Sequence, residues 1–454
     1  MMKRFRYICV SGEDDRELVL GGIGTYLGLL TRFCSKEYPQ AEIHWVIRSP
    51  DSRTWSSKDE NGVHRHYLSP NASSSFQVLK TTDKSLGQFS STMIFNTIAT
   101  KKVLSILRED VNLPTIIESG EWEGHGSELF SVLSEANILR VARLHTPLAT
   151  CIKQNRLHVG FAEIAQLWRE YLTLQNADLL SASTNYVKKR VVEDVFGSIH
   201  KAVVPIVTIP NPVDTEIFRP EKLNRKKGVA FINKLLGQEF FNNDTFNIVV
   251  IGSVEYRKGA NLVVDAFSKL SPLMPNARLC FVGRTAEQGE RKNANKKLSP
   301  HDLCKTVKPE ASQYIRFTGY VEHKKLPSAI AAGDIFPIFS LGDNFPGVVA
   351  EISLCGKPII AFQRGGVKEM LSDKRGEFLA VDLGNDLEKG VELFKEEILK
   401  LYKDKDRLEQ IGLTLRKLIL HKYEPSKITR QLYGCYLRRL EKKCLTRKRY
   451  FFHS

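Results

Sequence analysis

Short apolar runs alternate with helical patterns along this chain, and the alternation starts a second time near its middle. In the first half the strand-like runs are RYICV within residues 5–10, IHWVI (43–47), TIIES (115–119) and ILRVARLH (138–145). In the second half they are FNIVVIGS (246–253), RLCFVGR (278–284), YIRFTGY (314–320), IFPIFS (335–340) and PIIAF (358–362). Strands that alternate with helices predict parallel sheets with both faces covered. The chain is therefore predicted to form two α/β units.

The domain boundaries follow from where the pattern stops and restarts. We expect a first domain over 1–218, a linker over 219–245 that is rich in charge and asparagine, and a second domain over 246–425. Residues 426–454 then form a C-terminal helix with a basic tail, after a break near Pro425. A cleft between two such domains is the expected ligand site.

The charge and the cysteines restrict the partners. The formal net charge of +16 over 454 residues is consistent with nucleic acid, an acidic membrane surface or anionic substrates. Nucleic acid is not expected, because no zinc-finger spacing or aromatic RNA-binding strand accompanies the charge. The tail RRLEKKCLTRKRYFF (438–452) favours either peripheral contact with anionic lipid or an ordinary solvated helix end.

Location and metal content are also predicted from the sequence. No run approaches the roughly 20 apolar residues of a membrane helix, and the N-terminus is too short for a secretory signal. Eight scattered cysteines without metal-ligand spacing favour reduced thiols and no metal site. We therefore expect a cytoplasmic protein, in which the pair Asp404 and Asp406 belongs to a charged helix and binds no metal.

The stretch DNFPGVVAE (343–351) predicts an anion site. A helix is expected to begin near Pro346, after a buried strand, so that Asp343 lies on the loop at the strand's carboxyl end and Glu351 in the second helical turn. The amides of Gly347, Val348 and Val349 lack partners within such a helix and attract phosphate. The alternative is that Asp343 only caps the helix and Glu351 is solvated.

Three further segments carry candidate groups. GGIG (21–24) follows the first strand and brings backbone close to a ligand through Gly22 and Gly24, or is merely a tight turn. In GSVEYRKG (252–259), Arg257 and Lys258 precede a helix and suit a diphosphate, or face solvent. The bend at Gly319, Tyr320 and Val321 offers backbone amides.

These segments occur in one order: GGIG, VTIPNPVDTEIFRP, GSVEYRKG, FTGYV, DNFPGVVAE and CGKP. In that order the chain resembles the retaining glycosyltransferases of family four, also described as glycosyl transferases group 1. The resemblance implies the GT-B fold, with two Rossmann-like domains that face across a cleft. It also implies an acceptor-side N-terminal domain, a nucleotide-sugar-binding C-terminal domain and a C-terminal helix that packs back on the first.

The resemblance also implies roles for individual residues. Glu351 takes the ribose hydroxyls, Asp343 a hydroxyl of the donor sugar and Lys258 the diphosphate. The usual arginine of the family is Ser253 here, and Arg257 compensates from the same loop. His145 faces the donor sugar, and the remaining donor-binding positions are Gly22, Gly24, Gly319, Tyr320, Val321, Phe345, Gly347 and Val348.

The implied activity is transfer of a hexosyl unit from a nucleotide-diphosphate sugar to a glycan, lipid-linked or small-molecule acceptor, with retention and without metal or cofactor. No carboxylate pair of the hydrolase type is apparent in the sequence. Three alternatives stay open: a sugar-nucleotide epimerase or hydrolase on the same fold, an inactive nucleotide-sugar-binding homologue, and a polyanion-binding protein. The donor base, the sugar and the acceptor cannot be read from the sequence.

Overall fold

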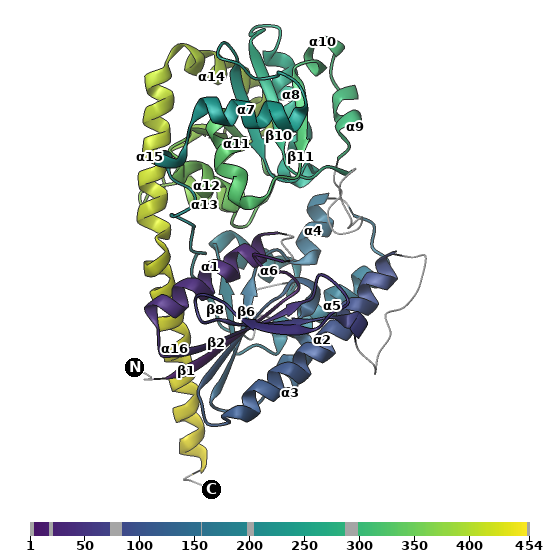
Figure 1. Cartoon of the computed structure of the whole chain (residues 1–454), viewed down its shortest axis with the longest axis vertical. Coiled ribbons are helices and arrows are strands. Elements are labelled where there is room, and N and C mark those ends of the chain that lie inside the picture. Colours follow the sequence, from purple (N-terminus) through teal and green to yellow (C-terminus); the bar gives the residue numbers. More distant parts are fainter. Residues whose placement is uncertain are drawn as a thin grey trace. The chain divides into compact units, whose positions relative to one another are not determined.

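The computed structural model describes residues 4–17, 21–72, 84–155, 157–197, 204–286 and 298–451. These residues divide into two compact units, each visible in Figure 1. Unit 1 consists of Met1–Ile152, His158–Pro212 and Pro425–Ser454, and unit 2 of Lys153–Leu157 and Val213–Glu424. Unit 1 is therefore built from chain segments on both sides of unit 2 in the sequence.

Unit 1 contains an eight-stranded sheet in the order β3-β4-β2-β1-β5-β6-β7-β8. Its strands are β1 (Phe5–Ser11), β2 (Ala41–Arg48), β3 (Trp55–Lys58), β4 (His64–Leu68), β5 (Thr115–Gly120), β6 (Ile138–Leu144), β7 (Leu179–Ala182) and β8 (Ile206–Thr208). All neighbours are parallel except β3 and β4, which are antiparallel. The sequence pattern did not anticipate β3 or β4.

Helices cover both faces of this sheet because alternate strand residues point to opposite sides. Phe5 and Tyr7 of β1 pack with α1 (Gly22–Glu37) and α16 (Pro425–Phe451), whereas Ile8 and Val10 pack on the other face. That other face carries α2 (Lys84–Glu109), α3 (Ser127–Val132), α5 (Phe161–Gln175) and α6 (Asn185–Asp194). The short helix α4 (Leu148–Asn155) follows β6, and its last residues belong to unit 2.

Unit 2 contains two three-stranded parallel sheets that meet at a bridge between Ile248 and Ile335. The first has the order β11-β10-β9 and the second the order β12-β13-β14. Their strands are β9 (Phe246–Ile251), β10 (Ala277–Val282), β11 (Ile315–Gly319), β12 (Phe336–Ile338), β13 (Ile359–Ala361) and β14 (Val381–Asp382). The bridge makes β9 and β12 neighbours, so the strands run 11-10-9-12-13-14.

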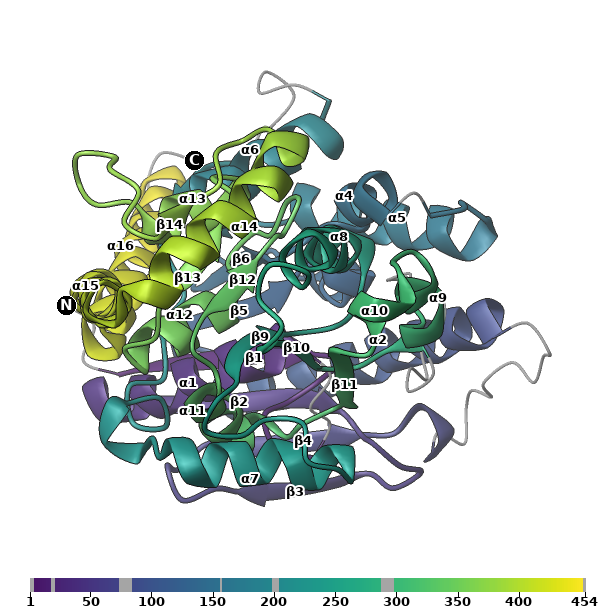
Figure 2. The same cartoon turned by 90° about the horizontal axis from the view of Figure 1, so that it is seen from above.

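The helices of unit 2 also form two layers. Figure 2 shows α8 (Ala260–Leu270) and α14 (Leu387–Lys403) on one side of β9 and β10, and α7 (Arg225–Leu236) on the other. With α7 lie α11 (Leu326–Ala332), α12 (Gly347–Leu354), α13 (Gly365–Leu371) and most of α15 (Lys405–Tyr423). The small helices α9 (Pro300–Lys305) and α10 (Pro309–Ser312) complete the unit. The parallel sheets with helices on both faces confirm the predicted fold class.

Three expectations from the sequence can be compared with the structure: those for the linker, for Asp404 and for membrane helices. Residues 219–245, expected as a linker, contain α7 and belong to unit 2, where α7 packs on α11. Asp404 caps α15 by accepting a hydrogen bond from the amide of Arg407 at 2.9 Å. In the described part of the chain, no helix is both long and apolar enough to cross a membrane.

Three histidines stack on β2 and β4 of unit 1. The ring of His44 lies 5.0 Å from that of His64 and 5.4 Å from that of His66. The His44 Nδ1 and His66 Nε2 atoms are 3.1 Å apart, and the Ser56 hydroxyl is 2.9 Å from His66 Nδ1. Burial, together with Lys102 and the neighbouring histidines, lowers the pKa of His66 to about 3. His66 is therefore neutral in the folded protein at pH values where the unfolded chain would protonate it.

This difference predicts a pH-dependent stability. A histidine whose pKa is depressed by folding contributes stability that is present above its unfolded pKa of about 6.5 and is lost as pH falls towards the folded value. When the pH falls from 7 to 5, the free energy of unfolding should decrease in both proteins. The decrease should be about 2 kcal/mol smaller in His66→Gln than in the wild type. All four tryptophans, Trp45, Trp55, Trp122 and Trp168, belong to unit 1, so urea unfolding followed by tryptophan fluorescence measures this unit.

The variant comparison is needed because burial raises the pKa of Glu121 to about 7 and of Glu170 to about 8, which has the opposite effect on stability. His301→Gln, at an exposed histidine of unit 2, is the control and should match the wild type. Equal pH dependence in His66→Gln and the wild type would contradict the assignment.

Candidate functional site

The predicted donor-site residues of unit 2 gather beside β9 and β12. The strand order reverses between these neighbours, and in parallel sheets ligands bind outside the carboxyl ends of the strands at such a point. The loop after β9 carries Arg257 and Lys258, and the loop after β12 carries Asp343. The fold therefore brings the neighbouring cations Arg257 and Lys258 together with Asp343, a carboxylate 85 or more positions later in the sequence.

Asp343 is bonded by both cations. The Lys258 ammonium donates to Asp343 Oδ2, and the Arg257 guanidinium donates to Asp343 Oδ1 at 3.3 Å. Arg257 also donates to Glu255 Oε1 at 3.2 Å. Burial opposes ionisation of Asp343, but Lys258 and Arg257 outweigh it and hold the pKa of this carboxyl well below its ordinary value. Asp343 is therefore a carboxylate that can accept further hydrogen bonds.

The two cations differ in exposure. The Lys258 side chain is 24% exposed, whereas the side chains of Arg257 and Asp343 are each 10% exposed. An ammonium has three N–H donors, so Lys258 can bond Asp343 and a ligand together. Arg257, which the sequence predicts as a second diphosphate contact, donates to Glu255 and Asp343.

Close backbone approaches fix the positions of these loops. The amide of Leu341 donates to the carbonyl of Arg257 at 2.8 Å. Gly259 has φ 72°, and a Cβ there would lie 2.2 Å from the carbonyl oxygen of Phe339. On the other side, the amide of Gly366 donates to the carbonyl of Asp343 at 2.7 Å. Asp343 is thus held by neighbours on both sides.

The helix α12 begins at Gly347, directly after Pro346, and no side chain caps it. Gly347 is exposed and Val348 is partly buried, so a ligand can reach this end of the helix. The predicted anion site requires such access. The Glu351 carboxylate turns back towards this end, because a Cβ on Gly347 would lie 3.5 Å from Glu351 Oε1. The predicted anion site and Glu351 therefore lie beside each other.

Glu351 has a partner that sequence reasoning missed. The Nε2 atom of His323 lies 2.7 Å from Glu351 Oε1. His323 begins η7 (His323–Lys325), a short turn after β11, and its ring packs edge-on against Phe218 with 5.2 Å between the ring centres. The signal available in the sequence was a histidine shortly after FTGYV, although nothing local pairs it with a residue 28 positions away.

The other predicted donor residues of unit 2 have mixed surroundings. Gly319 ends β11 with φ 77°, and the guanidinium of Arg284 lies over the exposed ring of Tyr320 at 4.4 Å. Val321 is 8% exposed and belongs to the core. Phe345 packs edge-on against Tyr423 of α15, and Ser253 lies in the loop after β9. Arg284 is a further cation at a strand end that the sequence prediction did not include.

In unit 1 the glycine loop is bonded by a neighbouring acid. Glu13 Oε1 accepts hydrogen bonds from the amides of Ile23 at 2.9 Å and Gly24 at 3.0 Å. Position 24 has no room for a side chain, because a Cβ there would lie 2.2 Å from the carbonyl oxygen of Asp14. Gly22 is exposed, and a Cβ there would meet nothing within 4 Å. Glu13 was not among the predicted residues.

His145 follows β6 in the same unit. Its ring contacts Tyr26 of α1 edge-on at 5.6 Å, and its amide donates to both oxygens of Glu121 at 2.8 and 2.9 Å. Burial and the charge of Arg143 lower the pKa of His145 to about 3, so its imidazole is neutral at pH 7. Unit 1 thus brings His145 close to the helix that carries Gly22 and Gly24.

A second polar cluster lies after β5 of unit 1. Glu123 is the one described residue other than glycine with positive φ, at 60°, and is 3% exposed. Its Oε2 accepts from Arg48 at 3.1 Å and lies 3.3 Å from His125 Nε2, while its amide donates to Glu170. Backbone strain of this kind clusters at functional sites.

No described group of three or more His, Cys, Asp or Glu side chains is arranged to hold a metal ion.

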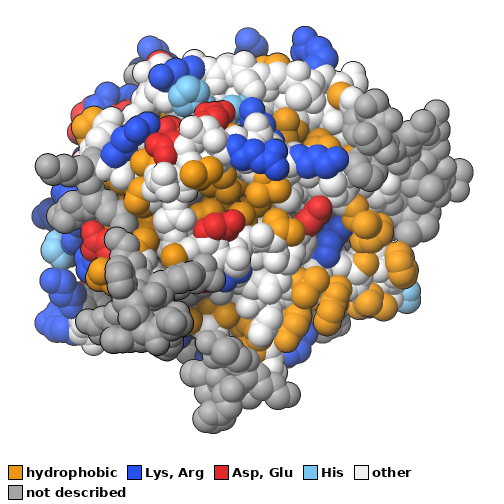
Figure 3. Space-filling model, turned by 90° about the horizontal axis from the view of Figure 1, so that it is seen from below, with side chains coloured by type: hydrophobic (Ala, Val, Ile, Leu, Met, Phe, Trp, Pro, Cys, Tyr) orange, Lys and Arg blue, Asp and Glu red, His pale blue; other side chains and the backbone are white. Residues whose placement is uncertain are grey.

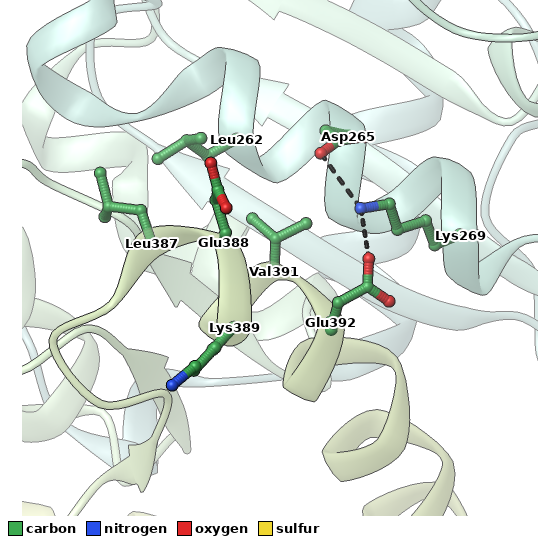
Figure 4. A pocket seen from close by; sticks show the side chains of 8 residues that line it. All are labelled: Leu262, Asp265, Lys269, Leu387, Glu388, Lys389, Val391 and Glu392. Atoms are coloured by element: carbon green, nitrogen blue, oxygen red, sulfur yellow. Dashed lines mark hydrogen bonds and ion pairs between the residues drawn. The ribbon is translucent and has the colours of Figure 1, made fainter.

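A separate surface groove lies between α8 and α14 (Figure 4). It has a volume of about 440 Å³ and is lined by Leu262, Asp265, Lys269, Leu387, Glu388, Lys389, Val391 and Glu392. Lys269 bridges Asp265 at 3.4 Å and Glu392 at 2.6 Å. Lys269 thus pairs with two of the three acids that line the groove, and none of the predicted site residues lines it.

Known proteins show sequence similarity to this chain. Residues 245–404 match the family model described as glycosyl transferases group 1. A phosphatidylinositol N-acetylglucosaminyltransferase subunit of Arabidopsis thaliana is 28% identical over 251 residues, which is 55% of this chain and 49% of that one. Mannosylfructose-phosphate synthase of Agrobacterium fabrum is 25% identical over 253 residues, 53% of this chain and 52% of that one. The chain spans about half the length of these curated relatives.

Solved structures resemble the chain over nearly its whole length. Sucrose-phosphate synthase from Thermosynechococcus elongatus has a TM-score of 0.70 at 17% identity, with 96% of this chain and 99% of that one covered. Anabaena HepE in complex with UDP-glucose has a TM-score of 0.62 at 16% identity, with 95% and 99% covered. At such identities the likeness shows the fold alone. Residues 245–404 therefore form a glycosyl transferases group 1 domain, and the two α/β units have the GT-B fold.

Proposed function

We propose that this chain is a retaining, metal-independent glycosyltransferase that moves a hexosyl unit from a nucleotide-diphosphate sugar to a glycan, lipid-linked or small-molecule acceptor. The observation that carries the proposal is the cluster of Lys258, Arg257 and Asp343 beside the start of α12, at the strand-order reversal of a group 1 domain. Such a place offers positive charge to the diphosphate and an ionised acceptor to a sugar hydroxyl.

Lys258 has the central role in this proposal. As the bond between the sugar and the diphosphate breaks, negative charge grows on the departing phosphate, and a fixed cation stabilises that charge. Lys258 can donate to the phosphate while it remains bonded to Asp343. Arg257 keeps Asp343 ionised and oriented towards a donor-sugar hydroxyl. The charge a metal ion would otherwise supply comes from Lys258 and the amides of α12.

The remaining roles follow the family resemblance. Glu351 receives the ribose hydroxyls, and the amides of Gly347 and Val348 bind the outer phosphate or the sugar. In unit 1, His145 and the loop with Gly22 and Gly24 serve the donor, and Glu13 holds that loop in place. HepE was solved with UDP-glucose, which supports a nucleotide sugar as donor. The name of the Arabidopsis relative supports a lipid-linked acceptor.

Substitution of the donor-site residues tests this function. After a thermal-shift screen of UDP-, GDP- and ADP-sugars identifies the donor, turnover is measured with labelled donor and product analysis. Lys258→Ala should lower kcat by about 10²- to 10³-fold, because one charge-stabilising donor is lost. Glu351→Gln should raise the KM for the donor roughly tenfold or more, because a charge-assisted hydrogen bond is weakened.

Lys269→Ala is the matched control, because Lys269 lies in the groove of Figure 4 and should leave turnover unchanged. Hydrolysis or isomerisation of the donor without acceptor would identify the epimerase or hydrolase alternative. Donor binding without turnover in the wild type would identify an inactive binding homologue. Wild-type turnover in Lys258→Ala would contradict the role of Lys258.

We further propose that the exposed basic face of α16 contacts anionic lipid. A hollow of about 260 Å³ on this helix is lined by Cys435, Arg438, Arg439 and Lys442, and Leu445 nearby is 63% exposed. Figure 3 shows basic and hydrophobic side chains near one another on the face seen from below. Basic groups near an anionic surface each contribute about 1 kcal/mol of binding. The part of the tail beyond Thr446 lies outside the described side chains.

Charge reversal tests this contact. The double variant Arg438→Glu with Lys442→Glu should bind phosphatidylserine vesicles at least roughly 30-fold more weakly, as expected for the loss of two such contributions. Vesicle sedimentation at low salt measures the binding, and neutral phosphatidylcholine vesicles give the background. The same charge change at Lys389 and Lys400 of α14 is the control. Equal weakening by both double variants would mean that net charge, not α16, controls binding.

A further inference from the structure

The imidazole of His323 lies between a candidate ligand-binding carboxylate and the core of unit 2. Its Nε2 atom is 2.7 Å from Glu351 Oε1, and its ring packs edge-on against the buried ring of Phe218. The side chains of His323 and Glu351 are 27% and 15% exposed. The contact is therefore partly shielded from water, and the Phe218 ring restricts the orientation of the imidazole.

The charged groups around His323 favour its protonated form. Glu351 faces it from α12, and Asp214 acts on it from the segment after β8. On its own turn, Glu322 pairs with both Lys324 at 3.3 Å and Lys325 at 3.0 Å, so one positive charge remains there, on side chains that are exposed to solvent. Burial alone would lower the pKa of His323, but Glu351 and Asp214 outweigh it and raise that pKa.

We propose that His323 is a positioning residue for nucleotide recognition: its Nε2–H holds one oxygen of Glu351 and leaves the other for the vicinal hydroxyls of the ribose in a nucleoside diphosphate. This inference rests on the proposed function and adds a residue to it. It explains why Glu351 Oε1 lies against the start of α12, over Gly347, rather than extending into solvent.

The imidazole bond has two consequences for binding. A glutamate held by one oxygen loses little conformational freedom when a ligand binds the other, so the ribose contact is stronger. The bond is also charge-assisted from both sides only while His323 carries its proton. Recognition of the ribose should therefore weaken as pH rises through the pKa of His323.

The test measures recognition of the ribose hydroxyls directly. Binding of UDP, GDP and ADP to the full chain is measured by calorimetry, and the nucleoside diphosphate that binds is compared with its 2′,3′-dideoxy analogue. The ratio of the two dissociation constants isolates the hydroxyl contacts, because the protonation of the phosphate affects both ligands equally. Measurements at several pH values between about 6 and 9 span the titration of a histidine with a raised pKa.

The wild type should prefer the ribonucleotide by roughly tenfold or more at low pH, and this preference should decline as pH rises. In His323→Ala the ribonucleotide should bind at most about threefold more tightly than its dideoxy analogue at every pH. His323→Gln keeps an N–H donor but cannot titrate, so it should retain a preference that does not change with pH. The glutamine variant keeps the test decisive if alanine disturbs folding, which circular dichroism monitors.

His301→Ala, at an exposed histidine of the same unit, is the matched control and should behave as the wild type. The inference is overturned if the wild type prefers the ribonucleotide and both His323 variants keep the same preference and the same pH dependence. If the wild type binds none of the three nucleotides, the proposed function itself fails. The two failures are therefore distinguishable.

Discussion

The donor-site geometry of unit 2 depends on one buried carboxylate. Asp343 lies where the strand order reverses, and two cations from the facing loop bond it. Removing a charge from water is costly unless opposite charges compensate, so the loop after β12 is stable in this position only while Lys258 and Arg257 are present. The same pairing fixes the loop after β9, which the backbone bond from Leu341 to Arg257 ties down a second time. Each loop therefore supports the other at the edge where a ligand binds.

A common arrangement links the polar groups that the family resemblance assigns to the donor. Lys258 is bonded to Asp343, Glu351 to His323, and the amides at the start of α1 to Glu13. Each group is therefore oriented by a protein partner, and the side chains of Lys258 and Glu351 keep some hydrogen-bonding capacity for a ligand. Lys258 has further N–H donors, and Glu351 has a second oxygen. Preorganisation of this kind reduces the conformational entropy lost on binding.

The sequence predicted the elements of this site better than the contacts within it. The turn after IFPIFS and the Pro-Gly pair located the start of α12 to within one residue, because helix starts have local signals. Arg257 and Lys258 could be selected as candidates because cations beside a helix start also form a local pattern. The bond between His323 and Glu351 was not predictable, because it joins the turn after β11 to helix α12 through the sheet topology. Glu13 was missed for a similar reason, since a side chain that returns to cap a helix ten residues later has no spacing rule. The edge strand β3 and its neighbour β4 were missed because their residues, including two histidines, are too polar to read as buried strands.

Unit 1 cannot complete its core before helix α16 has been synthesised. Its residues Ile428, Leu432, Tyr433, Tyr436, Leu437 and Leu440 belong to the same core as Phe5, Tyr7 and Trp45 of the first strands. Unit 2 has almost all of its residues between Val213 and Glu424, so it is nearly complete before α16 is synthesised. The apolar face of the first strands is therefore covered in part by α1 but completed only after α16 has been synthesised. Apolar surface that stays exposed during synthesis favours aggregation, so the face that α16 covers is a site of risk until that helix is made.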